Sequence, residues 1–303
     1  MDLNAEIGKL DWSREPRGLY EPIGYTLAAG GKRVRPMLAL LATRVFGGKE
    51  EDVLNAALAL EVFHNFTLLH DDVMDKAEVR RGRQTVHVKW NENTAILSGD
   101  QMMIEAYKLL SGVPENKLAK TLRLFNKMAT EICEGQQYDV DFEQRNDVTI
   151  GEYMEMIRLK TSVLLATALQ IGAYIAGADD KQQQALYNFG INIGLAFQIQ
   201  DDLLDCFGNP TTFGKAIGGD IREGKKTFMW LTARDKVGAG WKTNGKDLAV
   251  VLREYEELGV RKAAEDKIAE LTSKALESLK QVPQNAATEE LRTLAEKLAA
   301  RKK

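Results

Sequence analysis

The sequence predicts an all-α protein, because its prolines are sparse and its apolar residues recur with helical spacing. The chain has six prolines, and none falls between Pro36 and Pro114 or between Pro114 and Pro210. Through both spans the apolar residues follow a helical period of about 3.6 residues. No stretch of convincing length alternates apolar and polar residues as a half-buried strand does.

The same periodicity places the individual helices, with further helix expected at the C-terminus. In chain order they are residues 17–29, 34–47, 51–76, 92–112, 115–143, 149–177, 181–207, 221–237 and 248–281. Two starts carry a recognisable signal. Asp52 precedes a long apolar run, and Thr149 with Glu152 three residues later forms a capping-box pattern.

No change of composition marks a domain boundary, so we expect residues 1–303 to form a single large helical bundle around a deep apolar cavity. The best candidate for a break is residues 238–245, GAGWKTNG, before a charge-rich segment. We expect residues 238–303 to form a peripheral helical layer. There is no internal repeat that would indicate a solenoid.

Composition excludes several classes of protein. A net charge of −3 over 303 residues argues against nucleic-acid binding. The two cysteines give no disulfide framework, and the N-terminal sequence shows no signal pattern, so we expect a cytoplasmic protein. Residues 161–178 are uncharged, but Thr, Ser, Gln and Gly dilute them, which favours a buried helix over a membrane span.

The most informative feature is an acidic motif that occurs twice. DDVMD occupies residues 71–75 and DDLLD occupies residues 201–205, each after an apolar, uncharged stretch. Residues i and i+4 share a helix face, so each copy presents a pair of carboxylates. Carboxylates this close repel unless cations lie between them, which indicates Mg²⁺ bound together with a substrate phosphate. Two solvated acidic patches are the simpler alternative. The duplication also suggests two facing helices that converge on one cavity.

Cationic residues accompany both motifs, as a bound phosphate would require. GGKRVRP at residues 30–36 places cations at a glycine turn before a helix, and RRGR at residues 80–83 follows the first motif. Lys160 opens a long apolar helix, and Lys215 and Lys225 follow the second motif. Any one such cluster is more often plain surface, but their positions favour ligand binding.

His64 lies seven residues, or about two helical turns, before Asp71, and therefore on nearly the same face. A lone histidine in an apolar helix is usually a satisfied core residue. The proximity to the acidic motif makes a ligand-binding role plausible.

In order and spacing, several segments together resemble the motif series of trans-isoprenyl diphosphate synthases. They are GGKRVRP, HNFTLLHDDVMDKAEVRRGRQTVH, RLKTS, FQIQDDLLD and FGKAIGGDIREGKKT, between Gly30 and Thr227. The resemblance implies a homodimeric helical bundle that condenses an allylic diphosphate with isopentenyl diphosphate. It implies three Mg²⁺ ions per site.

The resemblance also implies roles for single residues. Metal ligands would be Asp71, Asp75, Asp201 and Asp205, supported by Asp72 and Asp202. The allylic diphosphate would contact Arg80, Lys160, Lys215 and Lys225. Isopentenyl diphosphate would contact Lys32, Arg35, His64 and Arg81, beside Gly31. Thr161 and Gln198 would line the reacting carbons.

Chemistry supports this reading without the resemblance. Breaking an allylic C–O bond creates a carbocation and a diphosphate leaving group, whose negative charge metal ions and fixed cations stabilise. A dry cavity protects the cation from water. No side chain near the apolar region is an obvious strong base, so the departing diphosphate is the expected proton acceptor.

In this family, bulk before the first motif limits product length. Phe66 and Thr67 precede Asp71 by five and four residues, and one large and one small side chain there predict a C15–C20 product. The first motif also lacks the two-residue insertion common in bacterial farnesyl synthases, which favours geranylgeranyl diphosphate. On an ideal helix Thr67 lies closer to the Asp71 face than Phe66 does. If neither residue sets the length, Met102 or Met103 is the alternative.

Other functions stay open at this point. A longer-chain polyprenyl synthase would share every motif. A terpene cyclase would share the fold and one aspartate motif, but its second metal motif normally mixes Asn or Asp, Ser or Thr, and Glu, whereas this chain has DDLLD there. A non-catalytic partner subunit would have lost some aspartates or arginines.

Overall fold

The computed structural model describes residues 1–208, 217–238, 240–243 and 245–299. Helices dominate these residues, which confirms the predicted all-α class. The chain divides into two compact units. Unit 1 comprises residues 1–124 and 168–179, and unit 2 comprises residues 125–167 and 180–303. The expectation of a single domain, with residues 238–303 as a peripheral layer, stays a prediction.

Unit 1 contains the N-terminal helices and one short hairpin. Its elements are α1 (Leu3–Gly8), α2 (Arg17–Leu27), α3 (Val34–Val45), α4 (Glu50–Met74), β1 (Val79–Arg80), β2 (Arg83–Gln84), α5 (Val86–Lys89) and α6 (Glu92–Leu110), with the beginning of α7 (Glu115–Gln144) and most of α9 (Val163–Ile175). The antiparallel hairpin pairs Val79 with Gln84 and Arg80 with Arg83.

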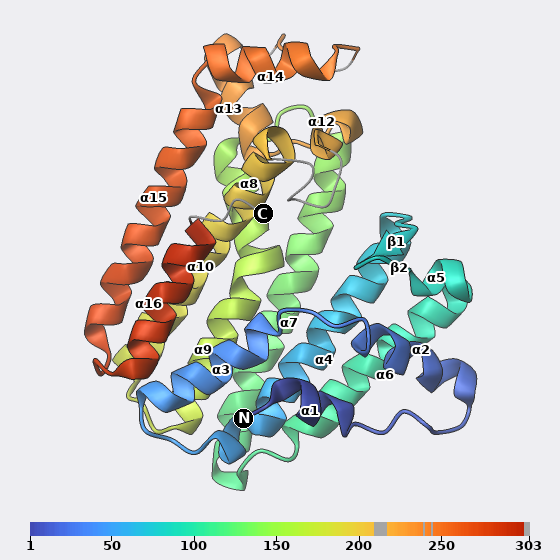
Figure 1. Ribbon diagram of the computed structural model, residues 1–303, viewed down its shortest axis with the longest axis vertical. Helices are drawn as coiled ribbons and strands as arrows, with labels where there is room; N and C mark the ends of the chain where they lie inside the picture. Colours follow the sequence, from blue (N-terminus) through green and yellow to red (C-terminus); the bar gives the residue numbers. More distant parts are fainter. Residues whose placement is uncertain (209–216, 239, 244, 300–303) are drawn as a thin grey trace. The chain divides into compact units, whose positions relative to one another are not determined.

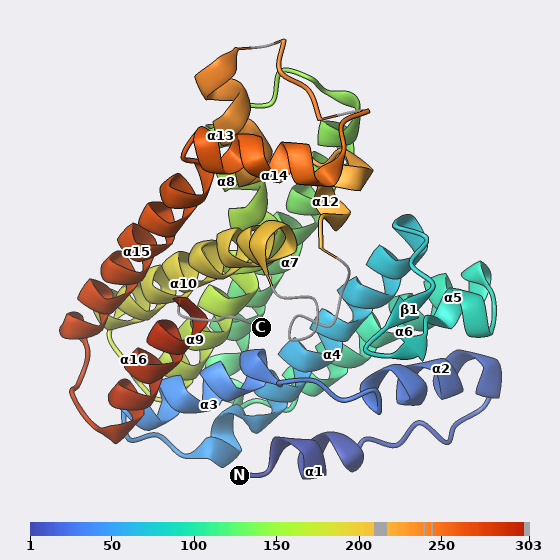
Figure 2. The same cartoon turned by 45° about the horizontal axis from the view of Figure 1, so that its top comes forward.

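The core of unit 1 forms where α4 packs between α3 and α6. Figures 1 and 2 show α4 and α6 side by side along most of their lengths. Phe63 of α4 and Met102 of α6 are fully buried there. Small residues bring the helices close: a Cβ added at Gly99 of α6 would collide with the His70 ring of α4. This close packing on α6 determines the orientation of the C-terminal turn of α4.

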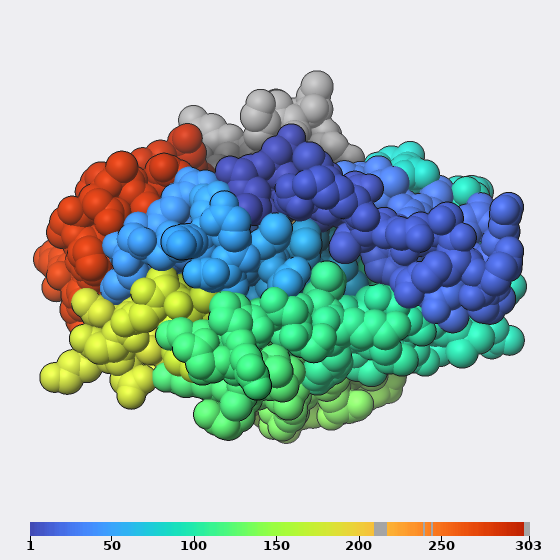
Figure 3. All heavy atoms as spheres, turned by 90° about the horizontal axis from the view of Figure 1, so that it is seen from below, coloured from blue at the N-terminus to red at the C-terminus, as the bar shows by residue number. Residues whose placement is uncertain are grey.

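The N-terminal segment packs onto unit 1. The amino group of Met1 pairs with Glu50 at 3.2 Å, and Asn4 accepts a hydrogen bond from Arg33 at 3.3 Å. In the space-filling view of Figure 3, the dark blue N-terminal residues lie directly against the lighter blue residues that follow them in the chain.

Unit 2 is built around α10. Its elements are most of α7, α8 (Ile150–Ile157), a π-helical turn (Arg158–Ser162), the start of α9, α10 (Asp180–Phe207), α12 (Gly219–Glu223), α13 (Phe228–Val237), α14 (Leu248–Glu257), α15 (Val260–Ser278), a 3₁₀ turn (Leu279–Gln281) and α16 (Ala286–Ala299). Figures 1 and 2 show α15 running alongside α10. Buried apolar residues such as Ile199 and Ile268 fill this interface.

Three of the predicted helices are interrupted. The helix predicted at 149–177 contains the π-helical turn, at the place where Gly135 of α7 and Gly194 of α10 come close to its backbone. Those predicted at 221–237 and 248–281 break at Gly224 and Gly259, which have φ angles of +70° and +63°. Glycine adopts this left-handed conformation at little cost, and it ends a helix there.

The start signals had mixed outcomes. The capping box at Thr149 and Glu152 is confirmed by hydrogen bonds in both directions. The prediction of Asp52 as a helix start is wrong, because α4 begins at Glu50, with Lys49 as its N-cap. An acidic side chain in the first turn interacts favourably with the helix dipole without being the N-cap residue. Asp52 therefore marks the first turn of α4 and not its N-cap. Among the described helices, none is long and apolar enough to cross a membrane.

Candidate active site

The first acidic motif lies at the C-terminal end of α4 in unit 1. Asp75 is the C-cap residue, and its N–H donates to the carbonyl of Asp71 at 2.8 Å. This i to i−4 bond keeps the two residues on one helix face. Asp71 is half-buried and Asp75 is exposed. The local geometry therefore provides the pair of carboxylates that the sequence predicts.

Asp72 points elsewhere and has a different environment. It is buried and accepts a hydrogen bond from Arg80 Nε at 2.7 Å. Burial raises the pKa of the Asp72 carboxyl, although the nearby Arg80 charge opposes that shift. Asp72 therefore anchors Arg80 and does not join the pair at the helix face.

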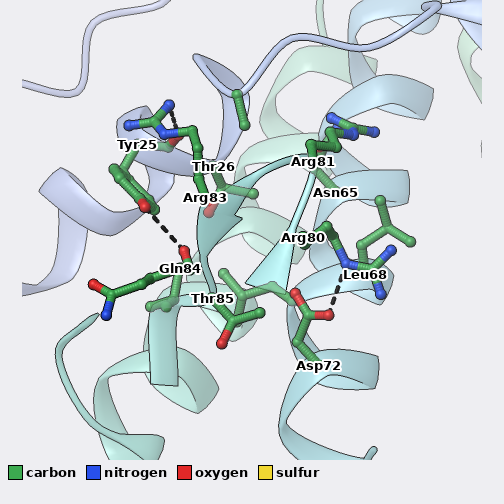
Figure 4. A pocket seen from close by; sticks show the side chains of 13 residues that line it. Tyr25, Thr26, Asn65, Leu68, Asp72, Arg80, Arg81, Arg83, Gln84 and Thr85 are labelled. Atoms are coloured by element: carbon green, nitrogen blue, oxygen red, sulfur yellow. Dashed lines mark hydrogen bonds and ion pairs between the residues drawn. The ribbon is translucent and has the colours of Figure 1, made fainter. Parts of the chain in front are cut away.

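Arg80 and Arg81 come from the β1–β2 hairpin. Figure 4 shows both side chains extending from the hairpin over α4, whereas Arg83 extends to the other side, over Tyr25. Arg81 and Gly82 form the turn with φ angles of +52° and +73°. Arg81 also donates to the carbonyl of Gly30. The hairpin thus brings two guanidiniums back over the helix that carries the first motif.

The glycine turn before α3 approaches the same arginine. Gly31 has a φ of +142°, and a Cβ there would lie 3.1 Å from the Arg81 guanidinium. A side chain would crowd this contact, which explains a glycine at the position. Lys32 beside it is exposed.

A group of cationic residues surrounds His64 in unit 1. Burial, followed by the charges of Arg35, Arg81, Arg80 and Arg33, holds the pKa of His64 well below its usual range. Burial also lowers the pKa of Arg35 to about 10, and Arg81 contributes in the same direction. Arg35 Nε is buried and finds no hydrogen-bond partner among the described residues. A buried donor without a partner is costly, so this cluster is suited to a bound anion.

Arg33 has a structural role within this group. Its guanidinium is buried, pairs with Glu61 at 2.6 Å and donates to the carbonyl of Leu27 at 2.7 Å. Glu61 also accepts from Asn65 at 3.0 Å. Of the three cations at the glycine turn, Arg33 is therefore tied to the core, while Lys32 is exposed and Arg35 is half-buried.

The second motif lies near the end of α10 in unit 2. Asp201 and Asp205 are half-buried, and Asp202 is buried. Asp205 accepts from the N–H groups of Gly219 at 3.2 Å and Asp220 at 3.1 Å. It thereby fixes the start of α12 against the end of α10.

Asp202 is the centre of a hydrogen-bonded group. It accepts from the Tyr153 hydroxyl, from Gln198 at 3.3 Å and from the N–H of Phe228 at 3.3 Å. Burial, with the charge of Asp220, raises the pKa of Asp202 to about 8, although the donated hydrogen bonds oppose the shift. Asp202 therefore supports the motif from within the core.

The π-helical turn presents Lys160 and Thr161 to two different helices. Lys160 pairs with Asp139 of α7 at 2.5 Å. Thr161 donates to Gln198 of α10 at 3.3 Å. The chain Thr161–Gln198–Asp202 therefore joins the RLKTS segment to the second acidic motif within unit 2.

The structure brings together most predicted site residues within each unit, with two exceptions. Lys225 is exposed; its side chain pairs with Glu223 at 2.9 Å, and its N–H donates to the carbonyl of Asp220 at 2.9 Å. Lys215 lies outside the described residues. No group of three or more His, Cys, Asp or Glu side chains with metal-binding geometry occurs in the described part of the chain. Paired carboxylates that share Mg²⁺ with a phosphate fit this arrangement better than a complete protein cage.

Four partners of the site were missed from the sequence. Tyr153 and Asp220 lie near Asp202, Asp139 meets Lys160, and Glu61 binds Arg33. Glu61 carried a usable signal, because it is a lone acid within an apolar helical stretch. Asp139 carried none, since its helix has many charged residues on exposed faces.

The fold and these side chains define a class of diphosphate-binding helical enzymes. A family model described as polyprenyl synthetase matches residues 16–240, and the chain belongs to this family. This membership confirms the resemblance seen in the motifs and the predicted class of trans-prenyltransferase.

Three similar proteins illustrate the family. A geranylgeranyl diphosphate synthase of Methanosarcina mazei is 44% identical over 77% of this chain and 73% of its own length. A geranylfarnesyl diphosphate synthase of Natronomonas pharaonis is 38% identical over 95% and 91%. The crystal structure of a geranylgeranyl pyrophosphate synthetase from Pyrococcus horikoshii is similar with a TM-score of 0.92, at 37% identity, over 99% of this chain and 95% of the other.

Proposed function

We propose that the chain condenses an allylic diphosphate with isopentenyl diphosphate, releases diphosphate, and forms a short-chain all-trans prenyl diphosphate. The observation that carries the proposal is the cationic group around His64, with the buried Arg35 Nε that has no hydrogen-bond partner in the described part of the chain. Two relatives named as geranylgeranyl and geranylfarnesyl diphosphate synthases support the reaction type. We propose a C15–C20 product, with geranylgeranyl diphosphate favoured.

Asp71, Asp75, Asp201 and Asp205 are the residues that would hold Mg²⁺, with three ions per site. The ions would neutralise the negative charge that develops on the leaving diphosphate. The exposed position of Asp75 and the half-buried positions of the other three suit carboxylates that complete their coordination with substrate oxygens.

The remaining residues would bind and orient the two substrates. Lys32, Arg35, His64 and Arg81, beside Gly31, would bind isopentenyl diphosphate, while Arg80, Lys160, Lys215 and Lys225 would bind the allylic diphosphate. Guanidiniums suit this task because they grip phosphate oxygens with two parallel hydrogen bonds. Thr161 and Gln198 would orient the reacting carbons, since their mutual hydrogen bond fixes both side chains.

We also propose a cytoplasmic homodimer. Its support is an apolar strip on α6 whose members are all exposed: Ile96, Leu97, Met103, Ile104 and Tyr107. At 3.6 residues per turn they fall within an arc of about 120°, so they share one broad helix face. Leu97 is 59% exposed, which is costly for a leucine unless another surface covers it.

The direct test supplies the purified protein with Mg²⁺, labelled isopentenyl diphosphate and one allylic starter at a time. Chromatography of the dephosphorylated products then reports chain length. We expect C15–C20 alcohols from at least one starter. Cyclic hydrocarbons would identify a terpene cyclase, and binding of diphosphates without turnover would identify a non-catalytic subunit.

A second test separates the two substrate sites. We expect Arg35→Ala to raise mainly the KM for isopentenyl diphosphate, because Arg35 belongs to the group around His64. Arg80→Ala should instead raise mainly the KM for the allylic substrate. Equal effects of both variants on both substrates would contradict this division.

A further inference from the structure

The turn that carries Lys160 and Thr161 is π-helical, and the reason lies on the neighbouring helices. Residues 158–162 form this turn between α8 and α9, and the N–H of Val163 bonds to the carbonyl of Arg158, five residues back. Ser162 adds a side-chain bond to the carbonyl of Ile157 at 3.4 Å. A π turn inside a helix is uncommon and is often found at functional sites.

Two glycines contact this turn from opposite neighbours. A Cβ on Gly135 of α7 would lie 2.8 Å from the carbonyl carbon of Leu159 and would collide with the N–H of Lys160. A Cβ on Gly194 of α10 would lie 2.6 Å from the Cα of Ser162. Real Cβ atoms do not make such contacts with backbone, so both helices reach the turn only because these residues are glycines.

The close approach of α7 and α10 at these glycines also brings the side-chain partners of Lys160 and Thr161 to the turn. Lys160 meets Asp139, one helical turn after Gly135 on α7, and Thr161 meets Gln198, one turn after Gly194 on α10. Each glycine therefore stands four residues before the partner of a predicted catalytic residue, on the same face of its helix. Moving either helix outward would lengthen the corresponding contact.

We propose that Gly135 and Gly194 are positioning residues that hold the π turn and thereby aim Lys160 and Thr161 at the substrate. The proposal rests on the proposed function, because it assigns the turn a role in prenyl transfer. A methyl group at either position pushes its helix away from the turn. Lys160 and Thr161 then no longer hold the positions that the reaction needs. The cationic group around His64 in unit 1 is unaffected, because none of its residues is changed.

Gly190 provides a matched control on the same helix. It lies one turn before Gly194, and a Cβ there would lie 2.7 Å from the backbone N of Ala166, in the regular part of the neighbouring helix. Gly190→Ala and Gly194→Ala therefore crowd the same pair of helices to a similar degree. Gly194→Ala crowds the backbone of the π turn, whereas Gly190→Ala crowds the backbone of a regular helix.

The experiment compares Tm and steady-state kinetics of the wild type, Gly135→Ala, Gly194→Ala and Gly190→Ala with saturating Mg²⁺. We expect similar decreases in Tm for the two α10 variants. Relative to Gly190→Ala, both Gly135→Ala and Gly194→Ala should lose at least tenfold in kcat, with less than a threefold change in the KM for isopentenyl diphosphate.

Equal kcat values for Gly190→Ala and Gly194→Ala would overturn the proposal, as would a crystal structure of Gly194→Ala with the π turn unchanged and kcat reduced. A variant too unstable to assay is replaced by Gly194→Ala combined with Ser162→Gly, which removes two of the crowded atoms. The kcat of this double variant is then expected to lie within tenfold of that of Gly190→Ala, and a larger loss overturns the proposal. An inactive wild type would contradict the proposed function instead.

Discussion

At the scale of single residues, the site is dominated by charges that the protein has brought together at a cost. Arg35, Arg80 and Arg81 all lower the pKa of His64, and Glu61 offsets only part of their charge. Like charges held together in a buried site raise the free energy of the folded protein, and a bound ligand of opposite charge offsets this. Two predictions at this scale test the metal and the charge state of the cluster.

The first prediction concerns the acidic pairs. Asp71→Ala and Asp201→Ala should each lower kcat by about a thousandfold, because a lost ligand weakens the stabilisation of the leaving diphosphate by several kcal/mol. Circular dichroism should show an intact helical fold. Asp52→Ala, in the first turn of α4, is the control and should keep nearly full activity. Normal turnover in EDTA would contradict the role of metal.

The second prediction follows from the lowered pKa of His64. The unfolded histidine titrates near 6.5 and the folded one well below, so the unfolded state takes up a proton first as the pH falls. Stability should therefore be full above pH 6.5 and should decrease by about 1 kcal/mol per pH unit below it. Urea unfolding of wild type and His64→Gln between pH 5 and 8 measures both free energies of unfolding. The gap between them should be constant above pH 7 and should vary with pH below 6.5. Parallel curves would contradict it.

At the scale of elements, α4 combines an acidic end, which we propose binds metal, with a face that packs on α6. Phe66 contacts the rings of Phe63 at 5.3 Å and His70 at 4.8 Å, and His70 in turn contacts the carbonyl of Ile96 on α6 at 3.1 Å. Thr67 bonds to the carbonyl of His64 at 2.8 Å. Phe66 therefore lies on the α6 side of the helix, while Thr67 stays near the Asp71 side.

The third prediction concerns this face. Phe66→Ala should lengthen the product by at least one C5 unit, because it removes a ring from the path of a chain that grows along α4. Phe66→Leu should give an intermediate distribution, measured by chromatography of the dephosphorylated products. An unchanged distribution in both variants would move the limit to Thr67 or to Met102. Met102 is fully buried, whereas Met103 is 36% exposed and less suited to line an internal chain.

At the scale of the whole molecule, the α6 strip gives the prediction for assembly. The chain has a mass of 33.8 kDa, so light scattering of the wild type should report about twice that value. Leu97→Glu with Ile104→Glu should give monomers, because charges placed in an apolar interface are costly. Val250→Glu on α14, which is 43% exposed, is the control and should leave the mass unchanged. A wild type at 33.8 kDa would contradict the homodimer.

The sequence alone determined the helical class and the acidic and cationic motifs on which the proposed site rests. Sparse prolines and helical periodicity specify helices locally, and the two DDxxD motifs carry their i, i+4 pairing within the helix itself. Neighbouring residues decide such features, so they can be read along the chain. The family followed from the same motifs.

Only the tertiary structure decided the partners of these residues. The tie between Arg33 and Glu61, the position of Tyr153 beside Asp202, and the π turn at Arg158–Ser162 depend on helices far apart in the chain. The sequence 149–177 reads as one continuous helix because its periodicity is helical throughout. The turn becomes π-helical where Gly135 and Gly194 let two other helices press on it, and no local pattern records a contact that another segment imposes.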